Sequence, residues 1–322
     1  MSSLFLRTNT ISQPLGLANS VQILCEKLQQ NKIVGLGEAH WFPSVFEYWQ
    51  NLVLHDDVLD VCQDIALEAG NLRFQKEVND YINGCQNTTE RHIHSMLMAS
   101  IVFPVWLAPY YLDFFRTVRQ RNERRKQQGK SLVRLHVMEP EFLWRDIRSK
   151  VDYLKVNGSR DEAFFRYVEQ HFVKANKSVI AIMGARHLLN ITQKFKQHNF
   201  AQLCRQHFPN TLFTVWPHIF KQPMLDGLVE EIEEHSQGVI ISTRSSRIES
   251  LDFSEICPMP QMEEDSIPLP KQVDACLLVK GVGRVMQWDT TRLSSVDVYD
   301  ILHRAQFLND KQQQLIHRMI QG

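Results

Sequence analysis

The sequence lacks several features that would assign its class at once. No window of about 18 consecutive apolar residues is present, which excludes a membrane-spanning helix. None of the six cysteines forms a C-x-x-C pair, so zinc-ribbon and thioredoxin-like sites are not expected. Lysine and arginine together number 36, as do aspartate and glutamate, which argues against a nucleic-acid partner. The first residues contain no apolar signal segment, so we expect a cytoplasmic protein with reduced thiols and no membrane partner.

The sequence does contain a regular alternation of short apolar runs and amphipathic stretches. The runs predict strands over 32–37, 64–70, 132–138, 178–184, 211–217 and 273–281. Helical spacing predicts helices over 45–55, 73–83 and 161–176. Such alternation is typical of an α/β fold with a mostly parallel central sheet flanked by helices.

We expect a single α/β domain over 1–322, because no linker divides the chain convincingly. A helical insertion at about 86–130 is expected to lie over the carboxyl end of the sheet, and the pattern is looser at about 218–322. Within that looser part, the proline-rich and acidic stretch 258–272 predicts a surface loop.

Two distant segments repeat one pattern, in which a strand ends in glycine and a histidine follows three residues later. These segments are "IVGLGEAH" (33–40) and "IAIMGARH" (180–187). Ligands of parallel sheets bind beyond the carboxyl ends of the strands, where glycine allows a close backbone approach. If the two strands are neighbours, His40 and His187 face a common cavity. Two further strand ends contribute carboxylates, so the candidate residues are Glu38, His40, Glu68, Glu139, Arg186 and His187.

Several of these segments resemble a known superfamily. "GLGEAHW" (35–41) resembles the G-E-x-H opening of erythromycin esterase-like proteins, whose relatives include ChaN-type haem-binding lipoproteins and the TraB/TIKI group. The segments "IALEAGNLRFQKEVNDYING", "YYLDFFRTVRQRN", "MEPEFLW" and "RDEAFFRYVEQHFVKANKSVIAIMGARHLL" are similar to later blocks of an uncharacterised esterase-like branch. The likeness runs from about residue 31 to 217. It departs from the family pattern at Trp41, Glu139 and Arg186, where glycine, aspartate and a small residue are common.

The resemblance implies an α/β fold with its site at one end of the sheet. It also implies a hydrolase in which His40 is the general base that activates water for attack on an ester or similar acyl bond. Glu38 or Glu68 would orient the imidazole, and His187 would position the water or protonate the leaving group. The candidate substrate-binding residues are Arg73, Arg186 and Glu139. The two arginines would bind an anionic group of the substrate or stabilise developing negative charge. The partner expected is a small-molecule substrate, and no cofactor is required.

Two alternatives remain open at this stage. His40, His187 and Glu68 could hold a divalent metal for hydrolysis, as the TraB/TIKI likeness implies. Alternatively, the chain could bind haem or another small ligand without catalysis, with the aromatic segment 102–115 lining an apolar pocket. No G-x-S-x-G segment is present, so a serine nucleophile is not expected.

Overall fold

The computed structural model describes residues 15–30, 32–190, 198–257, 267–282 and 293–321. Seven strands in these ranges form one sheet in the order β3-β2-β4-β1-β5-β7-β6. All paired neighbours are parallel except β6, which lies antiparallel to β7 at one edge. The strands are β1 (Ile33–Glu38), β2 (Asp64–Asn71), β3 (Arg134–Glu139), β4 (Val179–Gly184), β5 (Leu212–Pro217), β6 (Gly238–Ser242) and β7 (Ala275–Val279).

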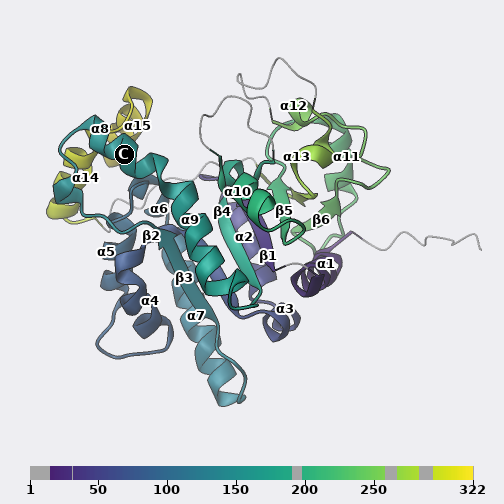
Figure 1. The fold of residues 1–322 in the computed structure, drawn as a ribbon, viewed down its shortest axis with the longest axis horizontal. Coiled ribbons are helices and arrows are strands. Elements are labelled where there is room, and N and C mark those ends of the chain that lie inside the picture. The colour runs from purple at the N-terminus through teal and green to yellow at the C-terminus, as the bar shows by residue number, and fades with distance from the viewer. Residues whose placement is uncertain (1–14, 31, 191–197, 258–266, 283–292, 322) are drawn as a thin grey trace, which may run out of the picture.

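The two faces of the sheet are covered by different groups of helices (Figure 1). Successive residues of a strand point to opposite faces, and in β1 Val34 and Leu36 join one core cluster while Ile33 joins the other. The first cluster includes α1 (Leu17–Gln30), α2 (Pro43–Val53), α3 (Asp56–Val61), α4 (Gln75–Ile82), α5 (Glu90–Met98) and α7 (Pro109–Gln127). The second includes α9 (Arg160–Val168), which continues as a π-helical turn to Val173, and α10 (Phe200–His207).

Two smaller clusters complete the core. One joins the β5-β7-β6 edge to α11 (Pro223–Glu230), α12 (Phe253–Ile256) and α13 (Leu269–Gln272). The other joins α6 (Phe103–Trp106), α8 (Lys150–Gly158), α14 (Ser295–Ala305) and α15 (Asp310–Gln321), of which α8, α14 and α15 lie together at one end of the molecule (Figure 1). Short 3₁₀ turns occupy Leu72–Phe74, Trp144–Asp146 and Ala185–Leu188. In the described part of the chain, no helix combines the length and apolar character needed to cross a bilayer.

The structure confirms the predicted α/β class and the positions of all six predicted strands. The sequence analysis missed β6, a five-residue edge strand in the part of the chain where periodicity weakens. The loop predicted at 258–272 needs a partial correction, because its last four residues form α13 and bury Leu269 and Gln272. Residues 258–266 of that stretch lie outside the described residues.

Candidate active site

The two glycine-to-histidine segments leave the sheet side by side. Strands β1 and β4 are hydrogen-bonded neighbours, with Glu38 paired in register to Gly184. Strand β2, which carries Glu68, lies on the other side of β4. The condition on which the sequence prediction depended is therefore met, and parallel pairing brings all three strand ends to the same edge.

A cavity of about 310 Å³ lies at this edge of the sheet. Its volume is at the lower end of the range for small-molecule sites, roughly 300 to 1,000 Å³. Five of the seven predicted site residues line it: Glu38, His40, Glu68, Arg186 and His187. The other lining residues are Ala39, Val102, Arg160, Gly184, Ala185, Trp216, Pro217, Ile219, Phe220 and Cys257.

The remaining two predicted residues do not line the cavity. Arg73 is exposed, with its guanidinium 5.3 Å from the centre of the Phe74 ring. Glu139 is completely buried behind the cavity, where it accepts hydrogen bonds from the backbone N–H of Ile101 and the indole N–H of Trp106. Burial outweighs these donors and the nearby Arg160 charge, and raises the pKa of Glu139 above its ordinary value.

His40 is held between a carboxylate and an aromatic ring. Its Nδ1 lies 3.4 Å from Oε1 of Glu38. The His40 and Trp106 rings form an edge-to-face contact, with 5.0 Å between their centroids. Glu38 also accepts a hydrogen bond from the Tyr111 hydroxyl. Burial lowers the pKa of His40, but the Glu38 carboxylate outweighs burial, so the net direction is upward. A base with such a pKa becomes neutral, and therefore active, only as the pH rises through it.

Glu68 and Arg160 form a buried ion pair in the centre of the site. The Glu68 carboxylate accepts hydrogen bonds from the Arg160 guanidinium and from the backbone N–H of Gly184. A nitrogen of Arg160 also lies 3.4 Å from Glu139. Burial alone would raise the pKa of Glu68, but Arg160 and His187 outweigh it and hold that pKa well below the usual range. Glu68 therefore remains a carboxylate at neutral pH.

His187 is fixed by carboxylates on both ring nitrogens. Its Nδ1 lies 2.7 Å from Asp161, and its Nε2 lies 3.4 Å from Glu68. Asp161 in turn accepts a hydrogen bond from the backbone N–H of Phe200. Burial lowers the pKa of His187, but Asp161 and Glu68 raise it more, to about 10. His187 is thus an imidazolium at neutral pH. This protonation state suits the role of a fixed cationic hydrogen-bond donor better than the role of a general acid, which must release its proton.

Gly184 leaves little space between the base and the buried carboxylate. A Cβ atom at this position would lie 2.9 Å from His40 Nε2 and 3.1 Å from Glu68 Oε2. The absence of a side chain therefore brings the β4 backbone against both groups.

Trp41, directly after His40, has a φ of 75°, which lies in the left-handed region that favours glycine. Its partly buried ring packs against two core clusters, which helps to hold that backbone conformation.

The residues present do not fit a metal or haem well. Across the described ranges, no three histidine, cysteine or carboxylate side chains converge on a point that could hold an ion. The Glu68 carboxylate is already paired with the cationic groups of Arg160 and His187, so its oxygens are not free to bind a metal ion. Both ring nitrogens of His187 already face a carboxylate, Nδ1 at 2.7 Å from Asp161 and Nε2 at 3.4 Å from Glu68, whereas a ligating histidine needs one nitrogen open to the metal.

Sequence reasoning missed four residues of the site: Trp106, Tyr111, Arg160 and Asp161. Asp161 and Arg160 begin α9, where charged residues usually indicate a solvated first turn. Trp106 and Tyr111 belong to the 102–115 segment, whose aromatic content alone indicates ordinary core packing. The contacts of these four residues in the site are set by the tertiary structure, because each is made with a residue at least 26 positions away in the sequence.

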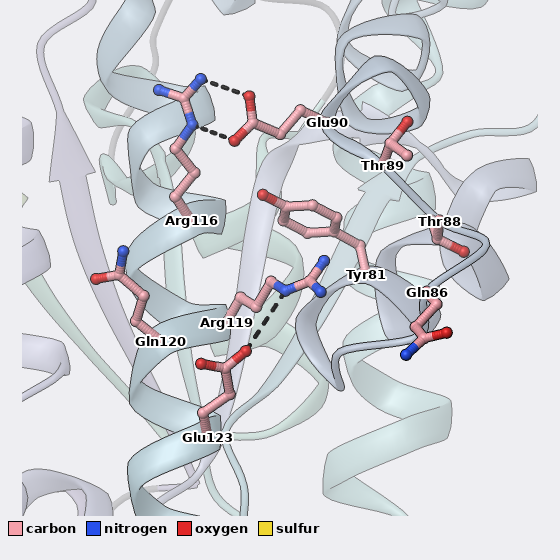
Figure 2. Close-up of a pocket in the computed structure, with 9 residues that line it drawn as sticks. All are labelled: Tyr81, Gln86, Thr88, Thr89, Glu90, Arg116, Arg119, Gln120 and Glu123. Carbon is pink, nitrogen blue, oxygen red and sulfur yellow. Dashed lines mark hydrogen bonds and ion pairs between the residues drawn. The ribbon is translucent and has the colours of Figure 1, made fainter.

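A second cavity, of about 430 Å³, lies between α7 and the α4–α5 region and is lined by polar side chains. Figure 2 shows that its two cations are already neutralised, since Arg116 forms two hydrogen bonds to Glu90 and Arg119 pairs with Glu123. No histidine is among the nine residues that line it, so it lacks a group that titrates near neutral pH. We take the cavity at the carboxyl edge of the sheet as the candidate active site, because His40, His187, Glu38 and Glu68 line it together.

The fold and the site define an α/β protein with a histidine and glutamate cavity at the carboxyl edge of a mostly parallel sheet. Among solved structures, this fold is shared by a Bacillus cereus protein at TM-score 0.55 and 14% identity, over 83% of this chain and 94% of that one. It is also shared by the erythromycin esterase EreC, a mutant in its open conformation, at TM-score 0.51 and 12% identity, over 82% and 96% of the two chains.

Haem-bound ChaN of Campylobacter jejuni gives a TM-score of 0.43 and 13% identity, over 81% and 91% of the two chains. No family model matches the chain, and no curated protein matches its sequence. The structural likeness thus confirms the expected fold, including its resemblance to an erythromycin esterase. At this level of identity, it leaves the chemistry to be argued from the residues of this chain.

Proposed function

We propose that this protein is a hydrolase that cleaves an ester or similar acyl bond of a small molecule in the cavity at the carboxyl edge of the sheet. The observation that carries the proposal is the position of His40. Its Nδ1 lies 3.4 Å from the Glu38 carboxylate, and the ring lines a cavity that also contains two cations, the buried Arg160 and the partly buried His187. A base beside fixed positive charges is the arrangement that acyl-transfer chemistry requires.

The proposed reaction uses His40 as the general base. The neutral imidazole takes a proton from water, and the resulting hydroxide attacks the acyl carbon to form a tetrahedral oxyanion. Glu38 stabilises the imidazolium that forms at His40. As the bond to the alcohol breaks, His40 returns the proton to the leaving oxygen, giving an acid and an alcohol. Positioned acid–base help of this kind contributes roughly 10² to 10⁴ in rate.

Arg160 and His187 would stabilise the oxyanion. Arg160 lines the cavity, and its Nε is buried without a hydrogen-bond partner among the described residues. His187 adds a permanent charge on the same wall, since its pKa of about 10 keeps it protonated. The carboxylates around these cations, Glu68, Glu139 and Asp161, hold them in place before the substrate binds, so little reorganisation is needed during the reaction.

The test replaces the base and compares turnover of simple 4-nitrophenyl acyl esters. We expect His40→Gln to lose about 10²-fold or more in kcat while the melting temperature stays close to that of the wild type. His171→Gln is the matched control, because His171 is exposed on the turn after α9 and does not line the cavity. Near-normal turnover by His40→Gln, or equal losses in both variants, would count against the assignment.

The metal-dependent alternative is separated by the same assay. If His40 acts on water directly, turnover is insensitive to a chelator and gains nothing from added zinc or manganese. Loss of activity on chelation, with recovery on addition of one ion, would replace this mechanism with a metal-assisted one.

A further inference from the structure

One cation of the candidate active site differs from the others in having no hydrogen-bond or ion-pair partner among the described residues. Arg160 is paired with Glu68 and Glu139, and His187 is paired with Asp161 and Glu68. The Arg186 side chain, by contrast, forms no hydrogen bond or ion pair with any described residue, although it is exposed and lines the same cavity. Its guanidinium therefore has open donors where a bound molecule would lie.

The position of Arg186 is fixed even though its side chain is free. It lies in the turn Ala185–Leu188, directly after β4. The side-chain amide of Asn199 donates to the carbonyl oxygens of Arg186 and Leu189, at 3.0 Å and 2.8 Å. Asn199 also caps α10, so that helix and the turn are tied together. A held backbone with an open guanidinium is suited to binding an external group, since less order is lost when it binds.

The carboxylates of the cavity are not available to neutralise Arg186. Glu38 is engaged by Tyr111 and by His40, and Glu68 by Arg160 and the backbone of Gly184. Of the three cations that line the cavity, Arg160 is paired with Glu68 and Glu139, and His187 with Asp161 and Glu68. Arg186 is therefore the lining cation whose charge no described carboxylate balances. The unbalanced charge is the exposed one, which favours an anion at the outer part of the cavity.

The wall contributed by the end of β5 is apolar. Trp216, Pro217, Ile219 and Phe220 line the cavity there, whereas His218 between them is buried outside the lining. Phe220 remains 38% exposed. Val102 and Ala185 add further apolar surface to the lining. An exposed aromatic ring and an exposed guanidinium around one cavity match a ligand that has an apolar body and a charged end.

We propose that the substrate of this site is an amphiphilic acyl compound carrying a carboxylate at a distance from the scissile bond, with that carboxylate bound by Arg186 and its apolar part lying along Trp216, Ile219 and Phe220. This proposal rests on the hydrolase function proposed above and narrows it to one substrate class. Arginine presents two parallel N–H donors, a geometry that matches a carboxylate. His40, Arg160 and His187 would then meet the acyl bond at the inner part of the cavity.

The test compares 4-nitrophenyl hydrogen adipate with the analogue whose distal carboxylate is a carboxamide. The two esters have the same length and the same leaving group, so their ratio of kcat/KM isolates the distal charge. We expect the wild type to prefer the anionic ester by about ten-fold or more, since a charge-assisted hydrogen bond is worth roughly that factor. The preference should shrink at high salt, because the guanidinium is exposed.

Two variants locate the charge that is responsible. Arg186→Gln should reduce the ratio to near one, and Arg186→Glu should invert it in favour of the carboxamide. Arg73→Gln is the control, because Arg73 also follows a strand of this edge but lies over Phe74 outside the cavity. The ratio of that variant should equal that of the wild type. A wild-type ratio near one, or a ratio that survives Arg186→Gln, would overturn the proposal while leaving the hydrolase function intact.

A binding measurement separates the two proposals if neither ester is cleaved. Isothermal titration with adipic acid monoanilide and its carboxamide analogue reports recognition without turnover. Tighter binding of the carboxylate form, lost in Arg186→Gln, would support the anion site while the absence of hydrolysis refutes the catalytic proposal. Equal or undetectable binding of both would refute the anion site as well.

Discussion

Replacing Gly184 by alanine is the sharpest test of the site's geometry. The glycine has φ −50° and ψ 130°, a conformation open to any L-residue, so alanine adds no backbone strain. The effect is therefore confined to the added methyl group. That carbon would lie 2.9 Å from His40 Nε2 and 3.1 Å from Glu68 Oε2, whereas optimal contacts between heavy atoms are roughly 3.5 to 4.0 Å.

The overlap has to be relieved by moving one of the two side chains. Glu68 is held by Arg160 and by the backbone N–H of Gly184 itself, so the His40 ring is the group expected to shift. Adding a methyl group to a well-packed region typically costs about 1 to 3 kcal/mol of folding free energy. A displacement of a catalytic group by about 1 Å can cost roughly 10² in rate. We therefore expect kcat to fall by about that factor, with a modest loss of stability.

The assay measures ester turnover and the melting temperature on the same preparations. Gly227→Ala is the matched control, because Gly227 lies within α11 and a Cβ there would have nothing within 4 Å. Alanine is the better helix former by about 1 kcal/mol, so this variant should keep its activity and gain stability. If Gly184→Ala turned over at the wild-type rate, His40 and Glu68 would not be packed as described, and the proposed base would lose its structural support.

Two further predictions follow from the charges around the histidines. In Glu38→Gln the carboxylate that raises the pKa of His40 is gone, so the acidic limb of the kcat/KM profile should move to lower pH, and an unmoved limb would exclude His40 as the titrating base. His187 has its pKa raised from 6.5 to about 10, so the stability it contributes is complete below pH 6.5 and is lost as the pH rises to about 10. Urea unfolding of the wild type should therefore weaken over that range, by at most about 1.4 kcal/mol per pH unit, and His187→Gln should flatten the decline.

The sequence alone determined the elements and the edge at which the chemistry lies. Runs such as "IVGLGE" and "VIAIMG" are apolar on successive residues because a parallel strand is buried on both faces. The residue that follows each glycine-ended run must then leave the core at the carboxyl end of the strand. That rule predicted one shared cavity for Glu38, His40, Glu68, Arg186 and His187, and in the structure all five line the same cavity. The same rule also named Glu139, which ends β3 but is buried outside the lining of the cavity, because the rule fixes the end of a strand and not the direction of a side chain. Arg73, which was named as a substrate-binding residue without that rule, lies outside the cavity as well.

Only the tertiary structure decided how these groups are charged and held. Arg160 and Asp161 look like the solvated start of a helix, and their pairing with Glu68 and His187 depends on how α9 packs beneath the sheet. Tyr111 and Trp106 reach Glu38 and His40 because α6 and α7 pack at that edge. Local sequence patterns indicate whether each residue is buried or exposed. A pKa, in contrast, depends on the distances between charged groups that are far apart in the sequence. Those distances are set by long-range packing. A protonated His187, and an Arg186 with no ion-pair partner in the part of the chain that the structure describes, could therefore be recognised only in the folded chain.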